Sequence, residues 1–265
     1  MKIEMSKEAD YGNWVPKSMM KMFWIVLGVL SLADVLLIVF LKKPVLIAAA
    51  LVITVLVLAM TVYMQICRNI FDFNKGAMMG DVHQFLVDHL PWDGKGQILD
   101  IGCGAGALTL RCAKAFPKSE LTGIDYWGTE WSYAKEQCER NAELEGVENR
   151  CVFKKGDASK LDFDDESFDA AVSNFVFHEV KTQPNKRLVV KEALRVVKKD
   201  GAFAFQDMFG QKQLYGDMNE FVEELRKEGI EEIHYIANIE NQDFIPGFVT
   251  APWMIKNAGL IYGIK

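Results

Sequence analysis

The sequence predicts a two-part α/β protein, in which a doubly wound parallel sheet is preceded by a hairpin of two membrane-spanning helices. Three observations carry this prediction. An apolar run that ends at Ile101 leads into a turn with three alternating glycines. Strand-like and helical segments alternate through the following residues. Two long apolar runs lie near the N-terminus.

The glycine turn begins at Asp100 and contains Gly102, Gly104 and Gly106. A strand followed by such a turn places bare backbone at a helix N-terminus, where it can approach a nucleotide-like ligand. Gly102, Gly104 and Ala107 also satisfy the dinucleotide-binding pattern G-x-G-x-x-G/A. At this point a dehydrogenase therefore remains a competing interpretation.

Further strands are expected at residues 120–125, 151–154, 168–174, 201–206, 232–236 and 259–264, with helices at 129–144 and 185–197. Asp125 ends the second of these strands, where a carboxylate can accept both hydroxyls of a ribose. Asp157 follows the third strand in a Gly-Asp-Ala step. A dehydrogenase requires no such aspartate after its third strand.

Taken in order, these motifs resemble the class I S-adenosylmethionine-dependent methyltransferases from about Lys95 to Phe209. The resemblance implies a Rossmann-like sheet of seven strands whose last strand is antiparallel. It implies that the glycine turn wraps the methionine part of the cofactor, that Asp125 holds the ribose, and that Asp157 and Ala158 read the adenine. The family's Pro-Gly-Gly turn before strand five is replaced here by Lys199-Asp200-Gly201, which still favours a tight turn.

The predicted cofactor-binding residues are Asp100, Gly102, Cys103, Gly104, Gly106, Asp125, Tyr126, Asp157, Ala158, Ser173 and Asn174. His178 follows the fourth strand, where substrate approaches in related enzymes, and is the predicted general base because its ordinary pKa is ~6.5. Glu179, Asp207 and Tyr215 are weaker candidates. The alternative is that His178 caps or packs on a helix. A thiol acceptor would ionise without a dedicated base.

The two apolar runs are residues 22–41, with Asp34 as the single charge, and residues 45–66, with none. Either run can cross the ~30 Å hydrocarbon core of a bilayer. More basic residues flank the pair than stand in the Lys42-Lys43-Pro44 turn, which predicts that both ends and the catalytic domain are cytoplasmic. The alternative is a buried helical pair in a soluble protein.

Asp34 is costly in lipid, by ~2.5–3.5 kcal/mol on insertion scales. Folding the hairpin about Lys43 brings Asp34 to roughly the level of Thr54. We therefore expect an interhelical hydrogen bond from a neutral Asp34 to Thr54 or to a neighbouring backbone group.

The predicted parts are an N-terminal cytoplasmic segment (1–21), the hairpin (22–66), a connector with a lid helix (67–94) and the methyltransferase domain (95–265). The lid helix is expected over residues 70–90, continuing almost directly from the second membrane helix. A second cover is expected from residues 238–253, which are rich in aromatic residues and proline. Methionines and aromatics at helical spacing are equally typical of core packing.

Composition argues against a nucleic-acid partner and against a metal site. A net charge of -6 without long basic clusters argues against a nucleic-acid partner. Five cysteines without a C-x-x-C pair indicate a reducing compartment and no metal site.

The predicted function is methyl transfer at the membrane surface to a small lipophilic nucleophile: a quinol, a phenol, a lipid or a thiol. The chain is similar in general terms to quinone-biosynthesis methyltransferases, and its anchored architecture is similar to that of alkyl-thiol methyltransferases. The alternatives are a protein methyltransferase and a noncatalytic S-adenosylmethionine-binding sensor or assembly factor.

Overall fold

The computed structural model describes residues 8–74, 76–127, 135–251 and 254–265. It divides the chain into two compact units, one made of Met1–Tyr11 with Asp81–Lys265 and the other of Gly12–Gly80. Of the described residues before the hairpin, 8–11 group with the C-terminal unit.

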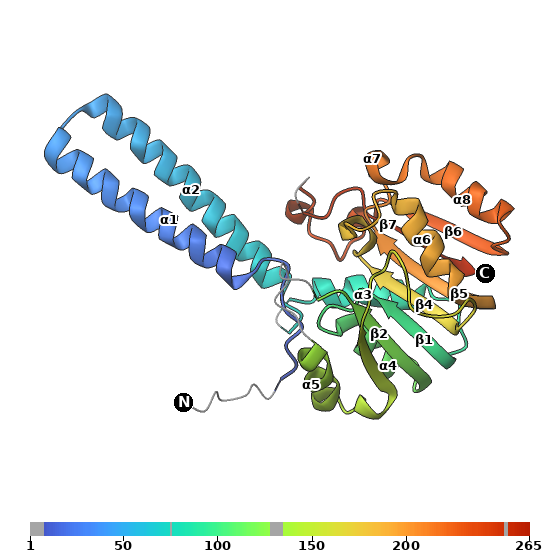
Figure 1. The fold of residues 1–265 in the computed structure, drawn as a ribbon. Coiled ribbons are helices and arrows are strands. Elements are labelled where there is room, and N and C mark those ends of the chain that lie inside the picture. The colour runs from blue at the N-terminus through green and yellow to red at the C-terminus, as the bar shows by residue number, and fades with distance from the viewer. Residues whose placement is uncertain (1–7, 75, 128–134, 252–253) are drawn as a thin grey trace. The chain divides into compact units, whose positions relative to one another are not determined.

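The Gly12–Gly80 unit is a helical hairpin (Figure 1). It consists of α1 (Lys17–Leu36), a π-helical turn η1 (Leu37–Leu41) and α2 (Pro44–Ile70). Lys42 adopts a left-handed conformation with φ 49°, and Pro44 occupies the first turn of α2, where its missing N–H removes no helical hydrogen bond. Taken with η1, the first helix runs over Lys17–Leu41, so both helical segments are longer than the predicted apolar runs, because residues that flank the runs continue the helical hydrogen bonding.

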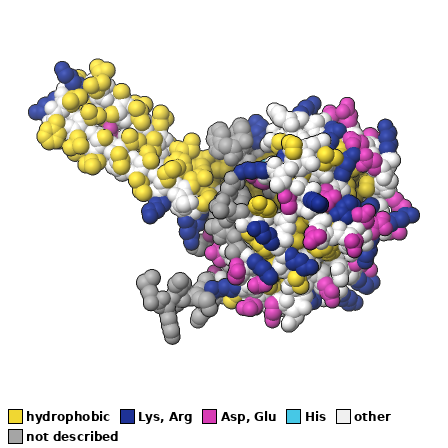
Figure 2. Space-filling view, viewed as in Figure 1, with side chains coloured by type: hydrophobic (Ala, Val, Ile, Leu, Met, Phe, Trp, Pro, Cys, Tyr) yellow, Lys and Arg dark blue, Asp and Glu magenta, His cyan; other side chains and the backbone are white. Residues whose placement is uncertain are grey.

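The side chains of this hairpin are apolar and largely uncovered, as Figure 2 shows for both helices. In the most apolar window of each helix only 6% of the residues are buried, and both helices have the length and composition to cross a membrane. Asp34 is an exception, with 6% exposure. The Thr54 hydroxyl donates a 2.7 Å hydrogen bond to Asp34 Oδ2. The predicted interhelical partner is confirmed, with the hydroxyl rather than the carboxyl as the donor.

One predicted helix is shorter in the structure. Residues 70–90 do not form a single lid helix, because α2 ends at Ile70 and α3 spans Met78–Asp88. A turn centred on Asp72 separates them: its carboxylate accepts the Asn74 N–H at 3.0 Å, and its carbonyl accepts the Gly76 N–H at 2.7 Å. Aspartate is typical of such turns because its side chain satisfies nearby backbone donors.

The other unit contains the sheet. Its strands are β1 (Lys95–Ile101), β2 (Lys118–Asp125), β3 (Cys151–Lys155), β4 (Phe168–Asn174), β5 (Val197–Asp207), β6 (Glu232–Ala237) and β7 (Gly259–Ile264). Their order is β3-β2-β1-β4-β5-β7-β6, and β7 runs antiparallel to both of its neighbours (Figure 1). The predicted seven-stranded sheet is confirmed. The order reverses direction between β1 and β4, and in open α/β sheets ligands bind at the carboxyl ends of the strands on either side of such a reversal.

The helices that follow α3 are α4 (Ala107–Ala115), α5 (Lys135–Glu145), α6 (Lys186–Arg195), α7 (Lys212–Tyr215) and α8 (Met218–Lys227). Leu99 and Ile101 of β1 belong to the core cluster that includes side chains of α6 and α8. Asp100 between them points to the opposite face, where it meets Thr109 of α4. The sheet therefore carries helices on both faces. The predicted helix at 129–144 lies partly outside the described residues.

The predicted turn before strand five takes another form. β5 begins at Val197, and its pairing with β4 shifts so that Phe168 faces Val197 whereas Ala170 faces Ala202. Asp200 takes a positive φ of 63° within this irregularity. The Asp-Gly pair thus forms a bulge inside β5, because a left-handed residue can be accommodated in a locally disrupted ladder.

Candidate functional site

The glycine turn between β1 and α4 is held by backbone hydrogen bonds to β2. The amides of Gly102 and Cys103 both donate to the Ile124 carbonyl, at 2.8 and 2.9 Å. Gly102 has φ 77°, and a Cβ at this position would lie 2.3 Å from Val176 Cγ2. Glycine is therefore required at residue 102 both by the backbone conformation and by the close approach of the segment after β4.

Asp125 meets the glycine turn from the end of β2. Its Oδ2 accepts the Gly104 N–H at 2.9 Å, and its Oδ1 accepts the Trp127 N–H at 2.7 Å. The Trp127 indole donates back to the Gly104 carbonyl at 2.9 Å. Burial raises the pKa of Asp125, while these backbone donors oppose the shift. The structure brings together the acid and the turn that the sequence places about twenty residues apart. The contribution of Trp127 was missed, since no motif marks it.

Asp100 lies behind the turn, with 3% exposure, and its Oδ2 accepts the Thr109 hydroxyl at 2.5 Å. Burial raises its pKa to about 7, against the effect of the Thr109 bond. The Cys103 side chain is also buried, with 6% exposure. These two side chains shape the turn from inside. The Tyr126 side chain, by contrast, is 60% exposed, with Lys155 Nζ 5.4 Å from its ring centroid.

Asp157 follows β3, as predicted. Its Oδ1 accepts the Ser159 N–H at 2.8 Å and the Thr182 hydroxyl at 2.9 Å. Burial raises the pKa of Asp157, but the bonds from Ser159 and Thr182 outweigh it and lower the pKa below its ordinary value. Ala158 is buried beside it, with 9% exposure. This carboxylate is therefore ionised at neutral pH.

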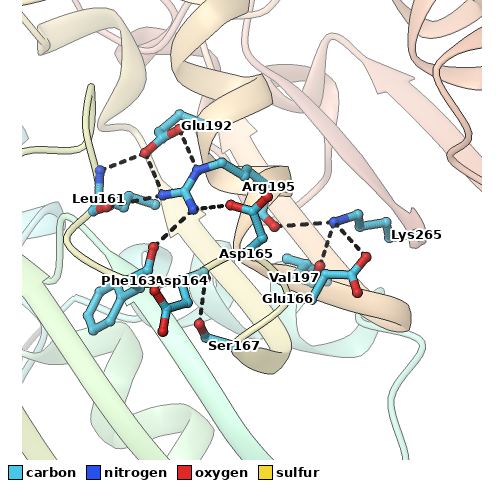
Figure 3. A network of polar contacts seen from close by, with 10 residues as sticks. All are labelled: Leu161, Phe163, Asp164, Asp165, Glu166, Ser167, Glu192, Arg195, Val197 and Lys265. Atoms are coloured by element: carbon cyan, nitrogen blue, oxygen red, sulfur yellow. Dashed lines mark hydrogen bonds and ion pairs between the residues drawn. The ribbon is translucent and has the colours of Figure 1, made fainter.

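The segment after Asp157 is held by Arg195 of α6 (Figure 3). Its guanidinium donates to the carbonyls of Phe163 at 2.9 Å and Leu161 at 3.1 Å, and it pairs with Asp165 at 2.6 Å. Glu192 accepts the Leu161 N–H at 2.7 Å and also binds Arg195 at 2.9 Å. Thus Glu192 and Arg195 of α6 together fix the segment that follows Asp157.

At the end of β4, Ser173 and Asn174 are used inside the protein. The fully buried Ser173 hydroxyl donates to the Ile101 carbonyl at 2.8 Å. Asn174 Nδ2 lies 3.0 Å from His83 Nε2, and its Oδ1 accepts the Gln206 Nε2–H at 3.0 Å. Burial, with a smaller effect of Arg111, lowers the pKa of His83 to about 3. The neutral ring can therefore accept the Asn174 N–H. His83 and Gln206 were not predicted.

His178, in the short helical turn that follows β4, forms an ionic pair with Asp207, the last residue of β5. His178 Nδ1 lies 2.8 Å from Asp207 Oδ1, and its Nε2 lies 3.4 Å from Glu179 Oε1. The fully buried Asp207 also accepts the Phe177 N–H at 2.7 Å. Burial lowers the pKa of His178, but the charges and hydrogen bonds of Asp207 and Glu179 outweigh it and raise the pKa to about 10. His178 therefore carries a positive charge at neutral pH.

The weaker candidates have distinct positions. Asp207 is fully buried and acts on His178. Tyr215 lies in the core with 1% exposure, and burial raises its pKa, so its hydroxyl is not a base at this edge.

Phe175, directly after β4, has a positive φ of 54°. This is a costly conformation for a bulky residue, and such strain clusters at functional sites.

Residues 99–205 match the family model described as a methyltransferase domain. A sterol 4-C-methyltransferase of Caenorhabditis elegans is 31% identical over 127 residues, which are 48% of this chain and 35% of that protein. A sterol 24-C-methyltransferase of Aspergillus fumigatus is 33% identical over 107 residues, 40% of this chain and 26% of that protein. A phosphatidylethanolamine N-methyltransferase of Cereibacter sphaeroides is 30% identical over 143 residues, 54% of this chain and 64% of that protein. The chain thus spans about a third or less of the first two relatives.

Solved structures share the fold. The [4+2]-cyclase SpnF has a TM-score of 0.52 at 19% identity, covering 69% of this chain and 79% of that chain. A geranyl diphosphate methyltransferase has a TM-score of 0.50 at 14% identity, covering 70% of this chain and 77% of that chain. Because a cyclase is among them, the fold by itself does not establish the reaction. The family match and the sheet topology together show that this chain contains a methyltransferase domain of the Rossmann-like, S-adenosylmethionine-dependent class I.

Proposed function

We propose that this protein is an S-adenosylmethionine-dependent methyltransferase that works at a membrane surface on a small lipophilic nucleophile: a quinol, a phenol, a lipid or a thiol. The observation that carries the proposal is the contact between the Asp125 carboxylate and the Gly104 amide. It places the acid proposed for the ribose against the turn proposed for the methionine part. Both residues are half-buried, so a ligand can reach them.

The chemistry of this edge fits the cofactor. Asp125 supplies a carboxylate for two ribose hydroxyls, and the ionised Asp157 supplies one for an exocyclic amine. Asp100, Cys103 and Ser173 are too buried to contact a ligand directly unless the turn opens, so in our proposal they support the site. When bound, S-adenosylmethionine supplies an electrophilic methyl group on a sulfonium. The protein must then orient the acceptor and exclude water.

We infer a modified role for His178. A ring already protonated at neutral pH cannot take a proton from the acceptor, as a general base must. A fixed imidazolium instead stabilises the anionic form of an acidic group beside it. Of the four acceptor types, thiols and phenols gain most from such a charge. Asp207 fixes the ring through Nδ1. The other ring nitrogen, Nε2, lies 3.4 Å from Glu179 Oε1, and in this proposal it is on the side from which the acceptor approaches.

A membrane location follows from the hairpin within this proposal. Its apolar side chains, such as Phe40 at 76% and Val45 at 79% exposure, are covered by no described part of the chain. A large uncovered apolar surface indicates a membrane or a partner, and the buried alternative for the helix pair loses its support. Relatives named for sterols and phosphatidylethanolamine fit a lipophilic acceptor. The basic residues around the hairpin support a cytoplasmic catalytic domain.

The proposal can be tested by label transfer. The detergent-solubilised full chain is incubated with methyl-labelled S-adenosylmethionine and an extract of host membranes and cytosol, and the product is partitioned into organic, aqueous and protein fractions. We expect label in the organic fraction. The matched control is Asp125→Ala, which should lose cofactor affinity and all transfer; label that persists with this variant comes from another enzyme in the extract.

Each other outcome has a distinct meaning. Label in the protein fraction supports a protein methyltransferase, and label in the aqueous fraction contradicts a lipophilic product. Cofactor binding without transfer to any fraction favours a noncatalytic sensor or assembly factor. Unchanged cofactor affinity in Asp125→Ala would show that the ribose site has been assigned to the wrong edge of the sheet.

A further inference from the structure

The segment just before the hairpin is fastened to the catalytic domain. Asn141 of α5 has 1% exposure and contacts the backbone of Asp10 twice. Its Oδ1 accepts the Asp10 N–H at 2.9 Å, and its Nδ2 donates to the Asp10 carbonyl at 2.8 Å. Such paired bonds recognise the main chain of one residue as a neighbouring strand would. The contact therefore depends on the backbone at residue 10 rather than on its side chain.

Two more contacts extend this attachment along α5. Gln137 Nε2 donates to the Asp10 carbonyl at 2.5 Å. The Tyr11 hydroxyl donates to Glu145 Oε1 at 2.7 Å, and Glu145 also pairs with Lys114 of α4. The attachment thus spans two turns of α5.

The same helix holds the glycine turn. Asn141 Nδ2 donates a second hydrogen bond, to the Ala105 carbonyl at 2.9 Å, and Cys138 Sγ lies 3.1 Å from the Gly104 carbonyl. Cys138 and Asn141 are three residues apart and so share one face of α5. The Asn141 side chain has two N–H donors and one acceptor oxygen, and both kinds of group are used in these three contacts. Asn141 therefore links the N-terminal segment to the turn.

A hydrogen bond that holds a backbone carbonyl also sets the direction of the N–H of the next residue. In a planar trans peptide the C=O and the following N–H point in opposite directions. When α5 holds the carbonyls of Gly104 and Ala105, it also sets the directions of the Ala105 and Gly106 N–H groups. The Gly106 N–H donates to the Cys103 carbonyl at 2.7 Å inside the turn. The Ala105 N–H lies just before the N-terminus of α4, the place where this fold presents backbone donors to a ligand.

We propose that Asp10 and Tyr11 form a strap that belongs to the cofactor site: through Asn141, Asp10 holds the glycine turn in its ligand-binding shape. Asn141 is then a positioning residue, and cofactor affinity depends on a segment that precedes the hairpin in the sequence. The inference rests on the proposed placement of the cofactor at the glycine turn.

The test separates the backbone contact from the side chain. Asp10→Pro removes the N–H that Asn141 accepts, and Asp10→Ala keeps it as the matched control. In the full chain, we expect the dissociation constant for S-adenosylhomocysteine to rise about fivefold in Asp10→Pro, as loss of one such hydrogen bond implies, and to stay unchanged in Asp10→Ala. Hydrogen exchange without ligand should be faster at residues 104–107 in Asp10→Pro alone.

Equal affinity and equal exchange in Asp10→Pro and Asp10→Ala would overturn the strap. Asn141→Asp, with the exposed Asn149→Asp as its charge-matched control, supplies a second test, because a carboxylate cannot donate to the Asp10 and Ala105 carbonyls. Weak binding in Asn141→Asp with normal Asp10→Pro would assign the effect to α5 alone and also refute the strap. If the wild-type chain does not bind S-adenosylhomocysteine, the proposed cofactor placement is wrong. Hydrogen exchange at residues 104–107 then still shows whether the strap holds the glycine turn. If Asp10→Pro does not fold, Tyr11→Phe carries that measurement.

Discussion

The charge on His178 makes the stability of the protein depend on pH in a defined window. The unfolded side chain has a pKa near 6.5, and in the folded protein Asp207 and Glu179 raise the pKa to about 10. Below about pH 6.5 both states hold the proton, so the contribution to folding is fully present. As pH rises toward 10 the unfolded state has lost its proton while the folded state keeps it, and the stabilisation declines until it is gone above about pH 10.

The size of the effect follows from the same two values. At 1.36 kcal/mol per pKa unit, the gap between them corresponds to about 5 kcal/mol of unfolding free energy. The His178 side chain is 20% exposed, so solvent screening makes this an upper limit. The slope should approach a loss of 1.36 kcal/mol per pH unit in the middle of the window.

The assay is denaturant unfolding of the detergent-solubilised protein, followed by tryptophan fluorescence from about pH 6 to about pH 10. His178→Gln is the reference at each pH, because subtracting its unfolding free energy removes the titration of other groups. Asp207→Asn should lose most of the slope while its remaining oxygen can still accept the Phe177 N–H. A difference between wild type and His178→Gln that is constant across the window would refute a buried ion pair at this site.

Two further predictions concern the hydrogen-bond networks. Thr54→Val should lower the stability of the purified protein by about 0.6 to 2 kcal/mol. Its effect should not add to that of Asp34→Leu, because both variants remove the same interhelical hydrogen bond. Additive losses in thermal unfolding would show that the two residues are not coupled. Arg195→Lys should cost about 2 kcal/mol of unfolding free energy, since an ammonium cannot reach both loop carbonyls and both carboxylates. The exposed Arg226→Lys should cost less than about 0.5 kcal/mol, and equal losses in the two variants would contradict the loop-holding role.

Local pattern was sufficient for the sheet and for part of the site. Each strand ends where an apolar run meets a turn residue, so the spacing from Gly102 to Asp125 predicted that the two would meet at one edge. The Asp34–Thr54 pair followed from counting residues on either side of the hairpin turn. In these cases the distance in space is fixed by a regular element or by its immediate turn, and the sequence carries the needed information.

The rest depends on contacts between distant segments. His83 lies 91 residues before its partner Asn174, and Asn141 lies 131 residues after Asp10. No period or motif relates such positions. Trp127 stands beside the recognised Asp125, yet nothing in a single tryptophan indicates that its indole closes on a glycine carbonyl. The bulge at Asp200 likewise could not be predicted without the pairing register of β4 and β5, because an Asp-Gly pair is compatible with several turns.

The three acids of the predicted site show how environment divides roles that sequence position leaves equal. Asp100, Asp125 and Asp157 each lie within two residues of the carboxyl end of a strand, at the same edge of the sheet. Burial raises the pKa of Asp100 to about 7, so this carboxyl changes charge near neutral pH. It accepts the Thr109 hydroxyl and shapes the turn from inside. Asp157, more open and bonded by Ser159 and Thr182, keeps its charge. Asp125 lies between these extremes and contacts the turn itself, which makes it the carboxylate whose loss should most directly reduce cofactor affinity.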